Sequence, residues 1–219
     1  MLAQIVLFDG FDPLDVIAPH EVLTAGGLVT GGMLEGELVS AEGARLVPSG
    51  LGSLGLHATG ALESARADLV VVPGAAGRLP DGNEAVDDSI PVILGRTLDT
   101  GLPALLKDAL DRPGVTVATV CGGSLVLAMA GLIDGRPATT HHLGLDLLEA
   151  TGTTAIDARI VDDGDLVTGA GVTSGLDLGL YLLERELGPR VALAVEKLFA
   201  HERRGTVWRA TGPVPTAAA

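Results

Sequence analysis

The only cysteine of this chain, Cys121, lies where a strand is expected to give way to a helix. The stretch "ATVCGGSLVLAMAGL" (118–132) has a β-branched apolar run before the cysteine, and two glycines and a second apolar run after it. A sharp turn at such a junction lifts one side chain to the carboxyl edge of a sheet, and small neighbours leave room for the strained backbone. Backbone N–H groups at the helix start would favour a thiolate, lower the pKa of the thiol and hold a developing oxyanion. The pattern therefore predicts a cysteine nucleophile, against the alternative of a small buried apolar residue.

Asp15 is the second residue whose type and position suggest chemistry. In "FDGFDPLDVIAPHEVL" (8–23) it follows the first expected strand, so it should lie at the same sheet edge as Cys121. A structural alternative is a helix cap in which Asp12 is the N-cap, Pro13 is the first helical residue and Asp15 closes the box three residues on. Another strand end, "VVPGAAG" (71–77), offers backbone N–H groups at Gly74 and Ala75, which is a weak signal by itself.

These residues need a sheet that brings strand ends together, and the chain predicts one. Uniformly apolar strand-like runs at 4–8, 67–77 and 115–120 alternate with helix-like segments, as a parallel sheet covered on both faces requires. We expect helices at 19–25, with Pro19 in the first turn, and at 124–132, 142–152, 173–187 and 189–202. Further strands are expected at "GELVSAEG", "RLVPSG" and "RPATT", and a hairpin with an Asp-Gly turn at 158–171. The fold class is thus a single doubly wound, mostly parallel α/β domain of the flavodoxin-like type.

The domain is expected to cover residues 1–205, followed by a C-terminal tail at 206–219. Asp177 is expected to be a structural partner on a helix face, and 201–205 a solvated helix end. The acidic run "DDGD" (162–165) suits a turn better than a metal site, so we expect no metal. No cofactor is predicted either.

Charge and cysteine content limit the partners. The net charge of −14 repels phosphate backbones and anionic lipid surfaces, so neither nucleic acid nor a membrane is expected to bind. A single cysteine excludes an intrachain disulfide framework and a multi-thiolate zinc site. The N-terminus lacks the cationic region of a signal peptide and no apolar run has the length of a membrane span, so a cytoplasmic protein is expected.

Several stretches together resemble a known group of proteins. They are "FDGFDPLDVIAPHEVL", "DLVVVPGAAG", "VATVCGGSLVLAMAGLIDGRPATTHH" and "LVTGAGVTSGLDLGLYLLERELG". In this order, from about residue 3 to 200, they look like the ThiJ/PfpI superfamily, with its class I glutamine amidotransferase-like fold. Within it the chain is most similar to the isocyanide hydratase branch and to the amidase-like sensor domains of AraC-type regulators.

The resemblance implies roles at the matching positions. Cys121 falls on the nucleophile of the family's elbow, and Asp15 on the acidic residue that hydrogen-bonds the sulfur. His141 falls on the histidine of a "TTH" motif, although its stretch could equally be a polar corner with a satisfied imidazole. The backbone donors around the sulfur would be Gly74, Ala75 and Gly122.

The chain also departs from the family pattern near the sulfur. Gly122 stands where the hydratases have a threonine, which removes one hydroxyl. Ala75 replaces the second glycine of the usual Pro-Gly-Gly, and His142 stands where a tryptophan is common. These departures leave the expected fold untouched and bear on the substrate.

The first function that we expect is a cysteine-dependent hydratase that converts an isocyanide to an N-formamide through a thioimidate. An alternative is a glyoxalase or deglycase acting on an α-oxoaldehyde through a hemithioacetal, with His141 as base. A second alternative is a non-catalytic redox or effector sensor. A DNA-binding reader is not expected in the 33 residues after Glu186. The expected partners are a small electrophile and, as the resemblance implies, a second copy of the chain in a homodimer.

Overall fold

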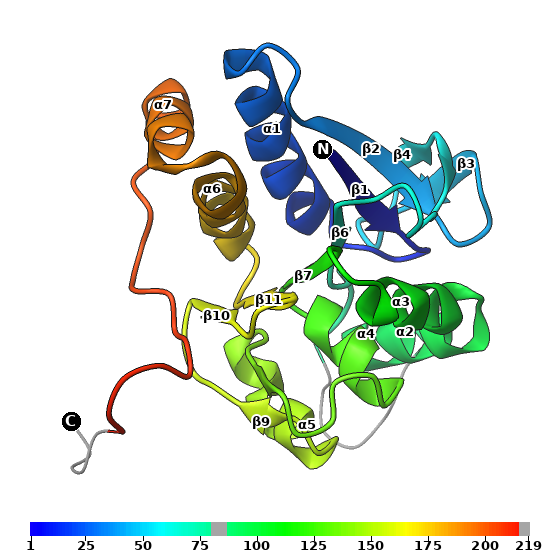
Figure 1. Ribbon diagram of the computed structural model, residues 1–219. Helices are drawn as coiled ribbons and strands as arrows, with labels where there is room; N and C mark the ends of the chain where they lie inside the picture. Colours follow the sequence, from blue (N-terminus) through cyan, green and yellow to red (C-terminus); the bar gives the residue numbers. More distant parts are fainter. Residues whose placement is uncertain (80–86, 215–219) are drawn as a thin grey trace.

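The centre of the molecule is a seven-stranded sheet. The computed structural model describes residues 1–79 and 87–214. The sheet order is β10-β11-β7-β6-β1-β2-β5, and every neighbouring pair is parallel except β10 and β11. Its strands are β1 (Leu2–Leu7), β2 (Glu35–Ser40), β5 (Gly60–Ala61), β6 (Leu69–Val72), β7 (Thr116–Val120), β10 (Ile160–Asp162) and β11 (Leu166–Gly169). The predicted mostly parallel sheet is confirmed (Figure 1).

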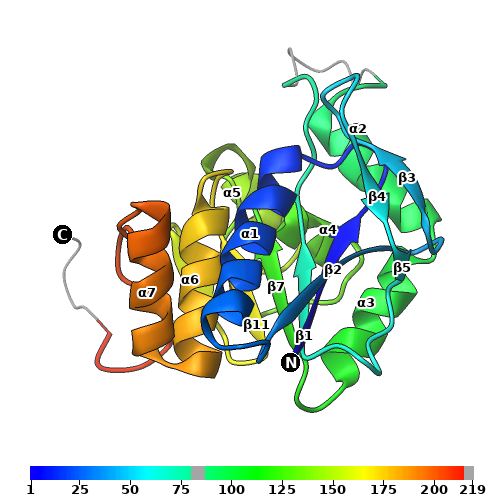
Figure 2. The same cartoon turned by 90° about the horizontal axis from the view of Figure 1, so that it is seen from above.

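Helices cover both faces of this sheet, as the doubly wound fold requires. On one face α1 (Pro13–Val29), α6 (Ser174–Leu187) and α7 (Pro189–Phe199) lie in a row, which Figure 2 shows from above. On the other face are α2 (Ile90–Arg96), α3 (Leu102–Asp111) and α4 (Gly123–Met129), with the short α5 (Leu145–Ala150) beyond α4. Two 3₁₀ turns, Thr97–Asp99 and His142–Gly144, precede α3 and α5.

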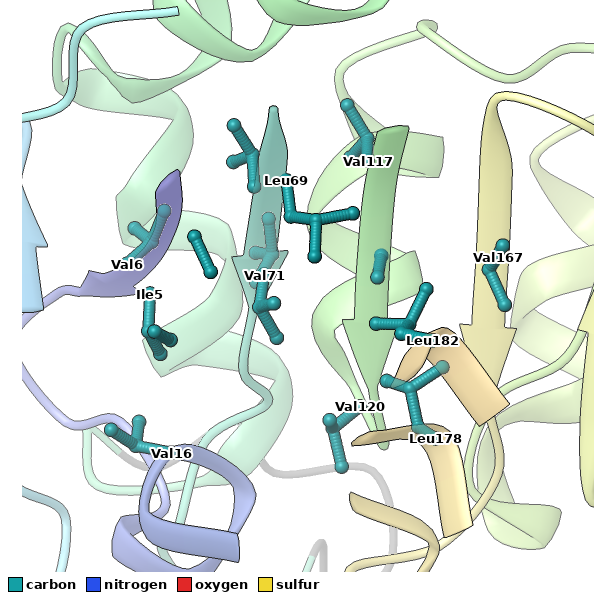
Figure 3. Packing of buried hydrophobic residues seen from close by; sticks show 14 of the residues in the cluster. Ile5, Val6, Val16, Leu69, Val71, Val117, Val120, Val167, Leu178 and Leu182 are labelled. Atoms are coloured by element: carbon teal, nitrogen blue, oxygen red, sulfur yellow. The ribbon is translucent and has the colours of Figure 1, made fainter. Parts of the chain in front are cut away.

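The core lies between the central strands and these helices. All residues of β6 and β7 are buried, because each strand packs against a helix layer on both of its faces. Figure 3 shows this layer, in which Val120 of β7 lies near Leu178 and Leu182 of α6. Burial of these aliphatic side chains is the main source of stability for the two central strands, in which only Thr116 and Thr119 are polar.

The first helix begins earlier than predicted. It starts at Pro13 rather than near Pro19, because the Asp12 side chain caps it by accepting a hydrogen bond from the Leu14 N–H at 2.9 Å. Pro19 therefore lies inside the helix and removes one backbone hydrogen bond. It packs closely on α6, where a Cβ on Gly175 would lie 3.0 Å from Pro19 Cδ. Tertiary packing thus outweighs the local signal of the proline.

Smaller strand pairs lie outside the central sheet. The predicted strand at 45–50 forms β3 (Arg45–Pro48), which pairs antiparallel with β4 (Gly55–Ala58). The predicted strand "RPATT" is reduced to β8 (Pro137–Ala138), which pairs with β9 (Thr154–Ala155). The predicted hairpin at 158–171 is confirmed as β10 and β11, with Gly164 at φ +85° in the turn.

Residues after α7 pack on the domain. The expectation of a solvated helix end at 201–205 is wrong, because a hydrogen bond of 3.0 Å joins His201 Nε2 to Oδ1 of buried Asp177. Asp177 also accepts from Arg159 at 2.5 Å, so its predicted structural role is confirmed. The division into a domain at 1–205 and a tail at 206–219 stays a prediction. Within that tail Trp208 forms a bridge with Val161 of β10, and residues 215–219 lie outside the described residues.

Among the helices of the described residues, none has both the length and the apolar character needed to cross a bilayer.

The crossing of α4 over β6 provides a test of the fold. A Cβ on Gly123 would lie 2.1 Å from the Val72 carbonyl oxygen, a backbone atom that cannot turn away. We expect Gly123→Ala to lower the free energy of unfolding by about 2 kcal/mol or more, as overpacking does. Denaturant titration measures it. Gly95→Ala is the control, because Gly95 lies inside α2 with no atom near its Cβ position. That variant should be stabilised by about 0.5–1 kcal/mol. Equal effects of the two substitutions would contradict the described crossing.

Candidate active site

Cys121 lies in a strained turn between β7 and α4. Its φ is +54°, a left-handed conformation that a residue with a side chain rarely adopts. The strand before it is fully buried, and α4 begins two residues later at Gly123. The predicted strand–turn–helix geometry is therefore present, and the residue is 8% exposed.

Hydrogen bonds from two other elements hold this turn. The Cys121 N–H donates to the carbonyl oxygens of Gly169 and Ala170, at 3.1 and 2.8 Å, where β11 ends. The Cys121 carbonyl oxygen accepts from the Thr140 hydroxyl at 2.8 Å. Thr140 is buried, and no local pattern in the sequence marks it as part of the site. Its position just before His141 in "ATTHH" is the one sequence feature that links it to the site, and only the fold brings it to Cys121.

Asp15 is completely buried in the first turn of α1. Its Oδ2 accepts from the Gly74 N–H at 2.9 Å, while the Asp12 N–H donates to the Gly74 carbonyl at 2.9 Å. This link decides against one alternative and corrects one prediction. Asp15 does not close a capping box, because its carboxylate points to the loop after β6. The Gly74 N–H is no free oxyanion donor, because Asp15 already occupies it.

Burial raises the pKa values of both candidate groups. The pKa of the Asp15 carboxyl lies well above its usual range, first because of burial and next because of the negative charge of Asp12. The pKa of the Cys121 thiol is raised by burial and then by the charge of Asp15, and the Gly122 N–H only partly opposes this. Asp15 Oδ1 has no hydrogen-bond partner within the described part of the chain.

The predicted lowering of the thiol pKa is therefore wrong. The helix start that should favour a thiolate belongs to a helix of only seven residues, and the adjacent charge is negative. Two buried acids that repel each other as anions titrate as a pair that retains a proton. The arrangement can therefore take a proton from sulfur to carboxylate and give it back.

A cleft of about 580 Å³ opens over Cys121. Its walls are mainly apolar and include Leu94, Leu125, Met129, Leu147 and Val172. Asp12, Cys121 and His141 are the only ionisable groups among the described lining residues. The cleft is suited to a small apolar molecule whose reactive atom meets the sulfur.

Two predicted backbone donors line this cleft. The Gly122 N–H hydrogen-bonds to the Cys121 sulfur, which partly opposes the rise in the pKa of the thiol. The Ala75 N–H donates to no backbone group of residues 1–79 or 87–214. The sequence does not predict that the side chain of Leu94 occupies the space next to Gly122. A Cβ on Gly122 would lie 3.0 Å from Leu94 Cδ1.

His141 lines the same cleft, and its ring is oriented by its neighbours. Its Nδ1 accepts from the Leu143 N–H at 3.2 Å, so in the neutral ring Nε2 carries the proton. Burial, and then the nearby His142, lower the pKa of His141. The ring centroids of the two histidines are 4.2 Å apart. His141 is thus a neutral hydrogen-bond donor at neutral pH.

No cluster of three or more potential metal-ligating side chains occurs within residues 1–79 and 87–214.

Comparisons with known proteins give one consistent family. Residues 95–185 match the model of the DJ-1/PfpI family. The isonitrile hydratase of Pseudomonas putida is 34% identical over 87% of this chain and 74% of its own length. The regulator CdhR of Pseudomonas aeruginosa is 30% identical over 89% of this chain, which spans about half, 53%, of that regulator.

Solved structures agree in fold. A ThiJ/PfpI family protein from Pseudomonas syringae superimposes with a TM-score of 0.74 at 26% identity, over 93% of this chain and 76% of that protein. An AraC family transcriptional regulator from Pseudomonas putida has a TM-score of 0.71 at 25% identity, over 90% and 98% of the two chains.

The buried carboxyl predicts a pH-dependent stability. A carboxyl whose pKa rises on folding stabilises the fold while protonated, below its unfolded value of about 3.9, and loses this contribution as the pH rises through the folded value. Asparagine does not titrate and can still accept from Gly74. We therefore expect Asp15→Asn to raise the free energy of unfolding at pH 8 by about 1–3 kcal/mol, with little difference near pH 4.

Unfolding curves of both proteins at each pH measure this difference, so that other titrating groups cancel. The same variant should lower the pH midpoint of Cys121 alkylation by iodoacetamide, since it removes the charge of Asp15. A stability difference that does not change between pH 4 and 8 would contradict the raised pKa.

Proposed function

The chain belongs to the DJ-1/PfpI family, and from this premise we propose that it adds water to small isocyanides, with Cys121 as the nucleophile. The observation that carries the proposal is the pair of Cys121 and buried Asp15 beneath an apolar cleft. The 34% identity to an isonitrile hydratase supports the same reaction class.

The first step joins the sulfur to the isocyanide carbon. Asp15 takes the thiol proton, the S–C bond forms, and the proton passes to the carbon, so that R–N≡C and Cys–SH become R–N=CH–S–Cys. The pair has to supply one nucleophile and one proton together. Two buried acids that share a proton meet this requirement, whereas a permanent thiolate without an adjacent acid would leave the carbon unprotonated.

The second step returns the free thiol. Water adds to the thioimidate carbon, the C–S bond breaks, and R–NH–CHO leaves while a proton goes back to sulfur. The N–H groups of Ala75 and Gly122 would stabilise the charge that develops on the incoming oxygen. The Nε2–H of His141 would help to orient this oxygen from the cleft wall.

An α-oxoaldehyde is the second candidate substrate, because His141 lies in the same cleft as Cys121. Its hemithioacetal would require a base to move a proton between carbons. The hydrogen bond to the Leu143 N–H occupies the free lone pair of His141, which favours the hydratase. A sensor role is a third candidate, since regulators such as CdhR are among the relatives.

Turnover of n-butyl isocyanide, followed by the formyl proton signal in NMR, tests the proposal. We expect formamide from the unaltered protein and none from Cys121→Ala, which removes the nucleophile. Thermal unfolding confirms that the variant is folded. Formamide that survives Cys121→Ala, or turnover of methylglyoxal with none of the isocyanide, would overturn the proposal.

A second prediction concerns the hydroxyl that the hydratases have after the nucleophile. Thr and Val at position 122 have the same shape, and both require the end of Leu94 to shift. We expect Gly122→Thr to exceed Gly122→Val in kcat by about tenfold, within the usual effect of one positioned hydrogen bond. Equal rates would show that a hydroxyl at this position has no role.

We also propose that the protein is a homodimer. The basis is the family resemblance, together with exposed leucines such as Leu28 and Leu198 on α1 and α7, which are 78% and 64% exposed. Light scattering at micromolar concentration should give twice the chain mass of 22.1 kDa. The mass of one chain would contradict this assembly.

A further inference from the structure

The cleft over Cys121 is apolar on most sides but carries one unbalanced charge, that of Asp12. This carboxylate caps α1 through a single oxygen, Oδ1, which accepts from the Leu14 N–H at 2.9 Å. Its Oδ2 makes no hydrogen bond or ion pair with the residues that the structure describes. Asp12 lines the cleft, so its carboxylate offers a ligand a negative charge and one oxygen without a partner among the described residues.

The charge of Asp12 extends to the reacting groups. It raises the pKa values of both Asp15 and Cys121, so it lies within electrostatic reach of the sulfur. His141, the only basic group among the described lining residues, is neutral at neutral pH because burial lowers its pKa. The charged groups among the described lining residues therefore sum to a negative charge.

Nearby arginines do not cancel this potential. A second cleft shares Leu51 and Gly77 with the first and contains three arginines, but each already has a carboxylate partner. Arg45 pairs with Asp9 at 2.7 Å, Arg78 with Asp88 at 3.5 Å and Arg96 with Asp87 at 3.3 Å. Their charges are balanced before a ligand arrives.

We propose that Asp12 is a specificity-determining residue and that the substrate is amphipathic, with an apolar body and a cationic group such as an ammonium. The apolar body would lie against Leu94, Leu125 and Leu147, and the cation would pair with Asp12 Oδ2. A carboxylate or phosphate at the same place would be repelled. The identity of the reacting carbon rests on the proposed function, but the charge preference is a property of the cleft alone.

Cys121 itself can report this preference, because it is the only thiol in the chain. Methanethiosulfonates of three charges serve as probes: cationic aminoethyl, neutral methyl and anionic sulfonatoethyl. Each transfers its alkylthio group, so Cys–SH and R–S–SO₂CH₃ give Cys–S–S–R and CH₃SO₂H. Rates are normalised to those of a small free thiol, which removes the intrinsic reactivity of each reagent.

We expect the cationic reagent to react about tenfold or more faster than the anionic one at low ionic strength, and the ratio to fall with added salt. Asp12→Asn should bring this ratio close to one. Asparagine is as good an N-cap as aspartate, so α1 keeps its start. A change in the thiol pKa alters all three rates alike and leaves the ratio unchanged.

Glu21→Gln is the matched control, because it removes one exposed carboxylate of the same helix away from the cleft. It should leave the charge ratio as in the unaltered protein, which excludes an effect of the net charge of −14 alone. A ratio that responds equally to Asp12→Asn and Glu21→Gln, or to neither, would overturn the inference.

A second arm separates the inference from the proposed function. An ω-ammonium alkyl isocyanide should have a lower KM than an alkyl isocyanide of equal length, and Asp12→Asn should bring the two KM values together. A charge ratio that collapses in Asp12→Asn without any isocyanide turnover would keep the cleft preference and reject the hydratase. Isocyanide turnover without any charge preference would support the hydratase and reject the proposed role of Asp12.

Discussion

A carboxyl group buried without a cation is the constraint on which the site depends. Asp15 is fully buried, one of its oxygens accepts from the Gly74 N–H, and the other has no partner among the described residues. Such a group costs stability as an anion and is best tolerated with a proton. The fold holds it within reach of a thiol, so the proton that burial retains is also the proton that the sulfur chemistry requires.

The glycines around the site follow from this constraint. For Asp15 to reach the backbone after β6, the start of α1, the loop at Gly74 and the turn at Cys121 must approach closely. A Cβ on Gly74 would lie 2.5 Å from the Gly122 nitrogen and 2.9 Å from Asp15 Oδ2. A Cβ on Gly123 would meet the Val72 carbonyl. The glycines therefore permit backbone contact between three segments far apart in the sequence.

Local patterns are sufficient to predict the fold and the strand–turn–helix geometry at Cys121, and they fail where distant groups decide. The buried β7 run and Cys-Gly-Gly after it indicated the turn at Cys121, because both signals lie in adjacent residues. Helix α1 starts six residues before the predicted Pro19, since packing on Gly175 compensates for a proline inside the helix. Three features of the site depend on contacts between distant residues, which no local pattern contains. The hydrogen bond from Thr140 to Cys121 spans 19 positions, and the one from the Gly74 N–H to Asp15 spans 59. The raised pKa of the thiol depends on Asp15, which lies 106 positions before Cys121.

The raised pKa of the thiol does not weaken the case for cysteine chemistry, because the reaction class decides which protonation state is useful. A peptidase needs a thiolate at rest and an imidazolium to protonate an amine, and here no cation accompanies the sulfur in the described cleft lining. Addition to an isocyanide transfers both sulfur and hydrogen to one carbon. A thiol paired with a carboxylate supplies both the sulfur and the hydrogen. The pair has one negative charge before and after the proton moves, so the transfer creates no second buried charge. A mainly apolar cleft then favours the addition, since it penalises separated ions but not the movement of a shared proton.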